Sequence, residues 1–171
     1  MKKNYLIGFS VAITIVVISF IVGFLFIKNA FKEKYCTSCD YVYDIAAEYI
    51  KEDIKKTNPE KNKKNFMTFV SYDTFGVTEK RGYKYAYMWI IDDSYYKEND
   101  DLEYAGGSSM FYKVKLEDGK VIDYEIPRDG TEYDKSVKKM SFDNKMYKKI
   151  INYSVNMSNE DKIKEYYSNK K

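Results

Sequence analysis

Residues Tyr83–Tyr96, with the sequence YKYAYMWIIDDSYY, decide the fold. Every second side chain from Tyr83 to Ile91 is aromatic or aliphatic, and this set alternates with a second set of residues at the intervening positions. A period of two, combined with many tyrosine, tryptophan and isoleucine residues, is typical of a β-strand. We therefore expect a long strand here and place the other elements around it.

Three further strands are expected on either side of this stretch. Alternation predicts one strand over Phe66–Phe75, before a turn-like segment at 76–82. It predicts another over Ser109–Leu116 and a last one over Val121–Ile126, joined by a tight hairpin turn at Asp118-Gly119. Pro127 stops the last strand, because proline cannot donate to a ladder.

Helical periodicity of about 3.6 residues precedes and follows these strands. The apolar stripe before them comprises Val42, Ile45, Ala46, Tyr49, Ile50 and Ile54. Ser38 or Asp40 can cap the start of this helix, and Asn58-Pro59 ends it. The stripes that follow the strands are Tyr133, Val137 and Met140, then Met146, Ile150 and Ile151, then Ile163 and Tyr167. The order predicts an α+β fold: one amphipathic helix packed on a four-stranded antiparallel meander of cystatin-like or NTF2-like form, then short helices.

The N-terminal region predicts a membrane anchor. Residues Tyr5–Ile27 contain no charged side chain, and a helix of this length spans a hydrocarbon core of about 30 Å. A cleaved signal peptide is the alternative, but the apolar run is long for one and no small-x-small cleavage site follows it. The interpretation is an uncleaved signal anchor that contacts the lipid bilayer through residues 5–27.

The predicted chain organisation follows from this anchor. It comprises a tail at 1–4, the anchor at 5–27, a juxtamembrane linker at 28–37 and a domain at 38–171. Lysines flank the anchor almost equally, and the short leading tail favours the N-in, C-out orientation. The expected location is therefore the cell membrane, single-pass, with an extracytoplasmic domain.

The charge of the domain argues against nucleic acid. Lys2 and Lys3 precede the anchor, so 27 of the 29 basic residues remain in residues 28–171 against 26 acidic ones. A nearly neutral domain with interspersed charges lacks the basic surface that binds phosphates. The remaining partners to consider are a protein or the cell envelope.

The two cysteines form a Cys36-x-x-Cys39 pair. This spacing suits a small structural disulfide, and a thiol at a helix N-terminus would also suit redox exchange. The chain has no histidine, which excludes Ser-His-Asp and Cys-His catalysis and mixed cysteine–histidine zinc sites. We expect no metal, no cofactor and no catalytic residue, although nearby carboxylates such as Asp92-Asp93 leave acid–base chemistry open.

Tyrosine is the remaining signal, at 19 of 171 residues. Rows of tyrosine suit a half-exposed surface that binds glycans, peptides or proteins, because the ring can be buried while the hydroxyl stays in water. The candidate binding face comprises Tyr83, Tyr85, Tyr87, Trp89 and Tyr112. The alternative is that these residues are strand formers that fill a small core.

Four segments carry a family resemblance: YMWI at 87–90, DSYY at 93–96, GSSMFY at 107–112 and IPRDGTEY at 126–133. Over roughly residues 83–140 the chain resembles a group of uncharacterised proteins of clostridia, which are Gram-positive bacteria. Those proteins are small and similarly built, and the resemblance implies no activity.

The sequence therefore predicts a non-catalytic binding or interaction module at the cell envelope. One alternative is a membrane-tethered thiol-disulfide protein acting through Cys36 and Cys39. The other is an accessory subunit whose anchor pairs with another membrane protein, for which Gly8 and Ala12 form a small-xxx-small pair.

Overall fold

A computed structural model describes residues 17–25, 32–99 and 101–169 of the chain. The chain divides into two compact units, Met1–Lys34 and Tyr35–Lys171. In the first unit, residues 17–25 are helical. The second unit has an α+β fold built around an antiparallel sheet.

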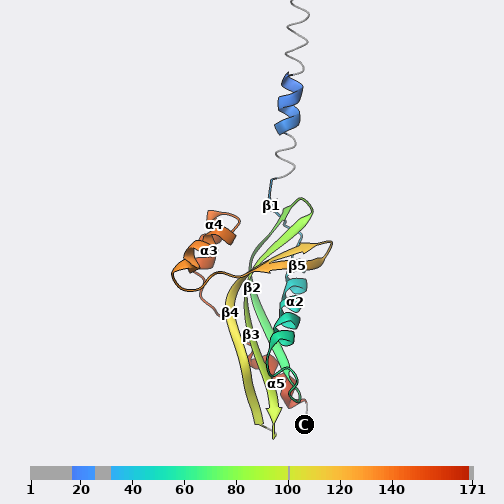
Figure 1. Cartoon of the computed structure of the whole chain (residues 1–171), viewed down its shortest axis with the longest axis vertical. Coiled ribbons are helices and arrows are strands. Elements are labelled where there is room, and N and C mark those ends of the chain that lie inside the picture. The colour runs from blue at the N-terminus through green and yellow to red at the C-terminus, as the bar shows by residue number, and fades with distance from the viewer. Residues whose placement is uncertain (1–16, 26–31, 100, 170–171) are drawn as a thin grey trace, which may run out of the picture. The chain divides into compact units, whose positions relative to one another are not determined.

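The sheet is a meander of five strands (Figure 1). The strands are β1 (Lys34–Tyr35), β2 (Met67–Lys80), β3 (Tyr83–Glu98), β4 (Asp101–Glu117) and β5 (Lys120–Glu125). They lie side by side in chain order, and each pair from β2 to β5 is antiparallel. The predicted number of four strands is wrong, because the two-residue strand β1 is too short to show any alternation. It lies inside the segment that was expected to be a linker.

The prediction of a membrane-spanning helix over residues 5–27 is also contradicted. Across residues 17–25, 32–99 and 101–169, no helix is long and apolar enough to cross a membrane. A helix over 17–25 extends for about 14 Å, roughly half of a hydrocarbon core. The rest of the predicted span lies outside the described residues. The predicted signal anchor and the single-pass, extracytoplasmic location depended on that helix and are corrected with it.

Two strands are longer than alternation predicts. β2 continues through the expected turn to Lys80, with Phe75 as an extra residue in a bulge between Thr74 and Gly76. β4 begins at Asp101, eight residues before the expected start at Ser109, and includes Gly106 and Gly107, a residue type that is common in turns. A Cβ atom on Gly107 would lie 2.4 Å from the carbonyl oxygen of Asp92. This glycine therefore permits close strand packing rather than a change of direction.

Helix α2 (Tyr41–Thr57) covers one face of the sheet. Its apolar side packs against alternate residues of β2, β3 and β4 in one core. The fully buried members of this core include Val42, Ala46, Ile50, Met88, Ile90 and Val114. The helical stripe expected over residues 42–54 is thus the side of α2 that faces the sheet.

The opposite face is covered by the C-terminal helices (Figure 1). These are α3 (Tyr133–Met140) and α4 (Asn144–Ile151), which follow the short helix η1 (Gly130–Glu132), and α5 (Glu160–Ser168). Helices α3 and α4 pack on Tyr87 and Phe111, and α5 packs on Phe69. Helices therefore cover both faces of the sheet. The backbone N–H and C=O groups that remain accessible lie mainly at its edges.

Candidate functional site

The predicted tyrosine face is partly a core. Tyr83, Tyr85, Tyr87 and Trp89 are alternate residues of β3, so their side chains share one face. Tyr87 is only 1% exposed because α3 and α4 cover it. Tyr112 pairs with Met88 across the ladder and therefore lies on the other face, under α2. The structure brings four of the five candidates together, with Tyr87 buried and Tyr83, Tyr85 and Trp89 half-buried.

The outer tyrosines are already in contact with lysines of β4. The ammonium of Lys115 lies 3.9 Å from the centre of the Tyr83 ring, and that of Lys113 lies 5.3 Å from the Tyr85 ring. Lys113 also pairs with Glu125 of β5 at 3.6 Å. These contacts cover the ring faces that a glycan or peptide would need for stacking.

The two cysteines form a disulfide in the structure. It joins the end of β1 to the start of α2 and packs against the core beneath that helix. The backbone amide of Cys36 donates to the carbonyl of Val77 at 2.9 Å, and Cys39 is 3% exposed. Thiol exchange requires access to a sulfur atom, so these contacts favour a structural bridge that holds β1 beside β2.

Replacing both Cys36 and Cys39 with serine is expected to lower the free energy of unfolding by about 2 kcal/mol. The reason is that a bridge over so few residues restricts the unfolded chain only modestly. Urea denaturation of the oxidised wild type and of the double serine variant measures the difference. Reduction of the wild-type bridge should reproduce it, and equal stabilities would contradict a structural role.

The adjacent carboxylates do not form a catalytic pair. Asp92 faces α2 and accepts a hydrogen bond from the hydroxyl of Ser108, whereas Asp93 points to the other face, where Asn159 donates to it at 2.8 Å. Two carboxylates on opposite faces of a sheet cannot flank one substrate bond. Over the described ranges, no group of three or more cysteine, aspartate or glutamate residues could hold a metal ion.

Asp92 is 4% exposed, and its burial raises the pKa of the carboxyl group above the usual value, with Asp93 adding repulsion. A raised pKa in the folded state means that the carboxyl group destabilises the fold as the pH rises through that pKa. We expect Asp92→Asn to unfold at higher urea concentration than the wild type at pH 7. The difference in stability between Asp92→Asn and the wild type should disappear as the pH falls below about 4, where the carboxyl group is protonated in the unfolded chain as well. Urea titrations across this range test the prediction, and a difference independent of pH would contradict it.

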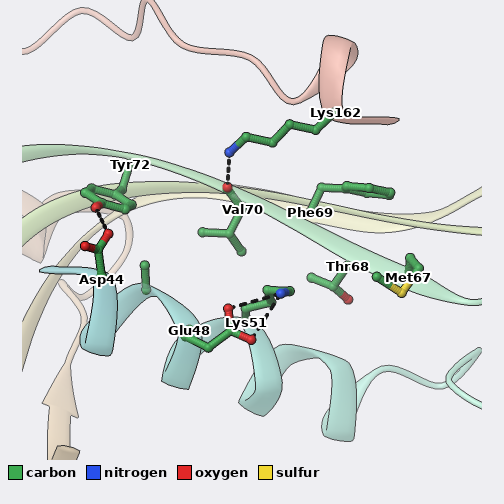
Figure 2. Close-up of a pocket in the computed structure, with 10 residues that line it drawn as sticks. Asp44, Glu48, Lys51, Met67, Thr68, Phe69, Val70, Tyr72 and Lys162 are labelled. Atoms are coloured by element: carbon green, nitrogen blue, oxygen red, sulfur yellow. Dashed lines mark hydrogen bonds and ion pairs between the residues drawn. The ribbon is translucent and has the colours of Figure 1, made fainter. Parts of the chain in front are cut away.

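A groove runs along the outer edge of β2, and we call it the β2 edge groove (Figure 2). It has a volume of about 440 Å³. Its lining residues are Asp44, Ala47, Glu48 and Lys51 of α2, Met67, Thr68, Phe69, Val70 and Tyr72 of β2, and Lys162 of α5. Neighbouring side chains of a strand point to opposite faces. A groove lined by four consecutive residues of β2 must therefore follow the strand's backbone edge.

The pairing of β2 with β3 determines the direction in which the backbone N–H and C=O groups at this edge point. The carbonyl of Val77 accepts from Cys36, which lies on the outer side of β2. Val77 pairs with Ala86, and Val70 pairs with Asp92 six residues further along β3. Residues an even number apart on a regular strand direct their backbone groups the same way. The N–H and C=O of Val70 therefore point away from β3, toward the groove.

The same alternation places the backbone groups of Thr68, Val70 and Tyr72 along the open edge. The only strand beside β2 on this side, within the described part of the chain, is β1, which reaches it near Val77. Thr68 is only 1% exposed, so its backbone groups are covered. At Val70 and Tyr72 the edge is partly exposed and directs N–H and C=O groups outward, the arrangement that accepts an added strand.

Side chains of α2 form one wall of the groove and are engaged with one another or with β2 (Figure 2). The hydroxyl of Tyr72 donates to the carboxylate of Asp44, and burial with this hydrogen bond raises the pKa of Tyr72 to about 12. Glu48 pairs with Lys51 at 3.1 Å. Both carboxylates of this wall thus have donors already.

Lys162 reaches the groove from the other side of the sheet. Its ammonium donates to the carbonyl of Val70 at 2.6 Å and to the hydroxyl of Ser71 at 2.9 Å. Burial lowers the pKa of Lys162, and repulsion by Lys51 lowers it further. A second hollow, of about 520 Å³, lies on this side of the edge and shares Phe69 and Lys162 with the groove.

Asn159 holds Lys162 in this position. It is 1% exposed, donates to Asp93 and accepts from the hydroxyl of Ser71 at 2.7 Å. Its carbonyl accepts from the amide of Ile163 at 3.0 Å, so it also fixes the first turn of α5.

Sequence reasoning missed both Lys162 and the β2 edge as a site, because β1 and the position of α5 decide which edge is open. An asparagine directly before a short amphipathic helix was the available signal. Comparison of the chain with protein-family models, with curated proteins and with solved structures found no match.

Proposed function

We propose that this protein is a non-catalytic interaction module that binds an extended segment of a partner protein as an added strand on β2. The observation that carries the proposal is the run of outward backbone groups at Val70 and Tyr72 in a lined groove. An extended peptide gains affinity from main-chain hydrogen bonds to such an edge and specificity from pockets for its alternate side chains.

The surroundings of the edge support this mode of binding. An added strand would direct one set of side chains toward α2 and the other toward α5. The β2 edge groove offers space of about 440 Å³ on the first side, and the hollow beside Tyr166 offers about 520 Å³ on the second. The two faces of the sheet are covered by helices, so its edge supplies the accessible backbone.

A peptide display library tests the proposal on the purified full chain. Seven-residue peptides rich in Val, Ile and Thr are selected for binding, and the best of them is then added to isotope-labelled protein. We expect slower hydrogen exchange at the amides of Val70 and Tyr72, which point outward from the unbound edge and are partly exposed. Amides that already bond to β3, such as that of Ser71, are the internal control.

N-methylation of the selected peptide separates strand addition from simple apolar contact. Methyl groups on the residues that face β2 should weaken binding by about tenfold or more, because they remove two or more hydrogen bonds. The same number of methyl groups on the alternate residues should have little effect. If no selected peptide protects the amides of Val70 and Tyr72, or if both methylated peptides bind equally, the proposal is wrong.

A further inference from the structure

Lys162 has no carboxylate partner among the residues that the structure describes. In the described part of the chain its ammonium has only neutral acceptors, the carbonyl of Val70 and the hydroxyl of Ser71. The nearest lysine on the same helix, Lys164, pairs with Glu160 at 3.3 Å. Lys162 is exposed, and lysines at protein surfaces usually stay hydrated or pair with an acid, so an ammonium held on a strand carbonyl calls for an explanation.

The ammonium also occupies an acceptor that an added strand needs. The carbonyl of Val70 is central among the outward groups of the edge, and Lys162 bonds to it at 2.6 Å. A peptide that pairs with β2 must take over this carbonyl. The ammonium then loses this hydrogen bond, and an acceptor on the peptide would replace it.

A carboxylate is the acceptor that fits. The two carboxylates of the groove wall are engaged, Asp44 with Tyr72 and Glu48 with Lys51. Lys51 and Lys162 repel each other across the groove, so an incoming negative charge would relieve that repulsion. A charge-assisted hydrogen bond is also stronger than the neutral one that it would replace.

We propose that the partner segment carries an acidic side chain that takes the ammonium of Lys162 and thereby frees the carbonyl of Val70 for strand pairing. This inference rests on the proposed strand addition and specifies its ligand as an acidic extended peptide. Lys162 would close the edge when no partner is present and would select the partner when one arrives. A lysine that only guards the edge against unwanted pairing is the competing explanation.

The selected display peptides test the inference first by their sequences. We expect aspartate or glutamate to be enriched at one fixed position. Two fluorescein-labelled versions of the best peptide, one with glutamate and one with glutamine at that position, are then titrated against four proteins. These are the wild type, Lys162→Met, the double variant Lys162→Met with Lys51→Met, and the control Lys164→Met. Methionine keeps an unbranched side chain that is one atom shorter and removes the charge.

For the wild type and for Lys164→Met, the glutamate peptide should bind about tenfold more tightly than the glutamine peptide. For Lys162→Met and the double variant the two affinities should become equal. Lys162 is exposed, so we expect the variants to fold. Circular dichroism and urea denaturation test this.

Two results would overturn the inference. The first is equal binding of both peptides to the wild type. The second is tighter binding of both peptides to Lys162→Met, which would make Lys162 a guard of the edge without selectivity. In either case protection of the amides of Val70 and Tyr72 by a peptide would still support strand addition, so the two proposals fail separately.

Discussion

Asn159→Ala is expected to lower the free energy of unfolding by about 3 kcal/mol and to loosen helix α5. The side chain is 1% exposed, and it connects α5 to two strands through Asp93 and Ser71. Alanine would leave a part-buried carboxylate and a hydroxyl without this partner. Truncations that leave buried polar groups without a hydrogen-bond partner are among the most costly substitutions.

Urea denaturation measures the loss of stability, and hydrogen exchange locates it. Amides of α5 should exchange faster, whereas those of α2 should be protected as in the wild type until global unfolding. Asn156→Ala is the matched control, because Asn156 lies three residues earlier and is exposed. It should change stability by less than about 0.5 kcal/mol. Uniform acceleration of exchange in α2 and α5 would contradict a local role for Asn159.

The same substitution should affect binding, because Lys162 lies one turn further along α5. A loosened helix no longer holds the ammonium on Val70. The preference of the protein for a glutamate over a glutamine peptide should therefore shrink in Asn159→Ala at temperatures where the sheet remains folded. Retention of the full preference would show that the position of Lys162 does not depend on this asparagine.

Phe111→Ala is expected to have the largest effect on stability, about 4 kcal/mol. The ring is fully buried between the sheet and helices α3 and α4. Its centre lies 6.0 Å from that of Phe75 in an edge-to-face contact. Alanine removes the apolar area and leaves a cavity that the surrounding strands cannot easily fill, because β4 is paired on both sides.

Thermal and urea unfolding measure this loss, and Leu102→Ala provides the control on the same strand. Leu102 is 42% exposed, so its truncation should cost less than about 0.5 kcal/mol. Phe111 lies on the α3 and α4 side, so peptide protection of the β2 edge should persist in the folded variant. Equal losses for the two substitutions would mean that α3 and α4 do not pack on the sheet as described.

Local periodicity accounts for much of the fold. The alternation over residues 83–96 falls within β3, and the apolar stripe over residues 42–54 faces the core from α2. These patterns predict the elements because burial of one face imposes a period of 2 residues on a strand and 3.6 residues on a helix. The glycines of β4 misled the prediction, since close strand packing and a turn leave the same local signature.

Contacts between distant segments explain the rest. Tyr112 is separated from the predicted tyrosine face because register pairs it with Met88, and a shift of one residue would have reversed the result. The candidate site depends on β1, β2 and α5, which lie far apart in the chain. Lys162 carries no local pattern of its own, so its meeting with Val70 emerges only when the chain is folded.

The bulge at Phe75 and the bridge between Cys36 and Cys39 have a consequence for colloidal behaviour. Together they end the open run of β2 after Tyr72, because the bulge breaks the alternation and β1 occupies the edge beyond it. Two copies of the chain that met edge to edge would share only the few hydrogen bonds of this short run, one of which Lys162 already occupies. Fibrous growth needs a long, flat and continuous edge. The open part of β2 is therefore a poor template for edge-to-edge growth of a fibre.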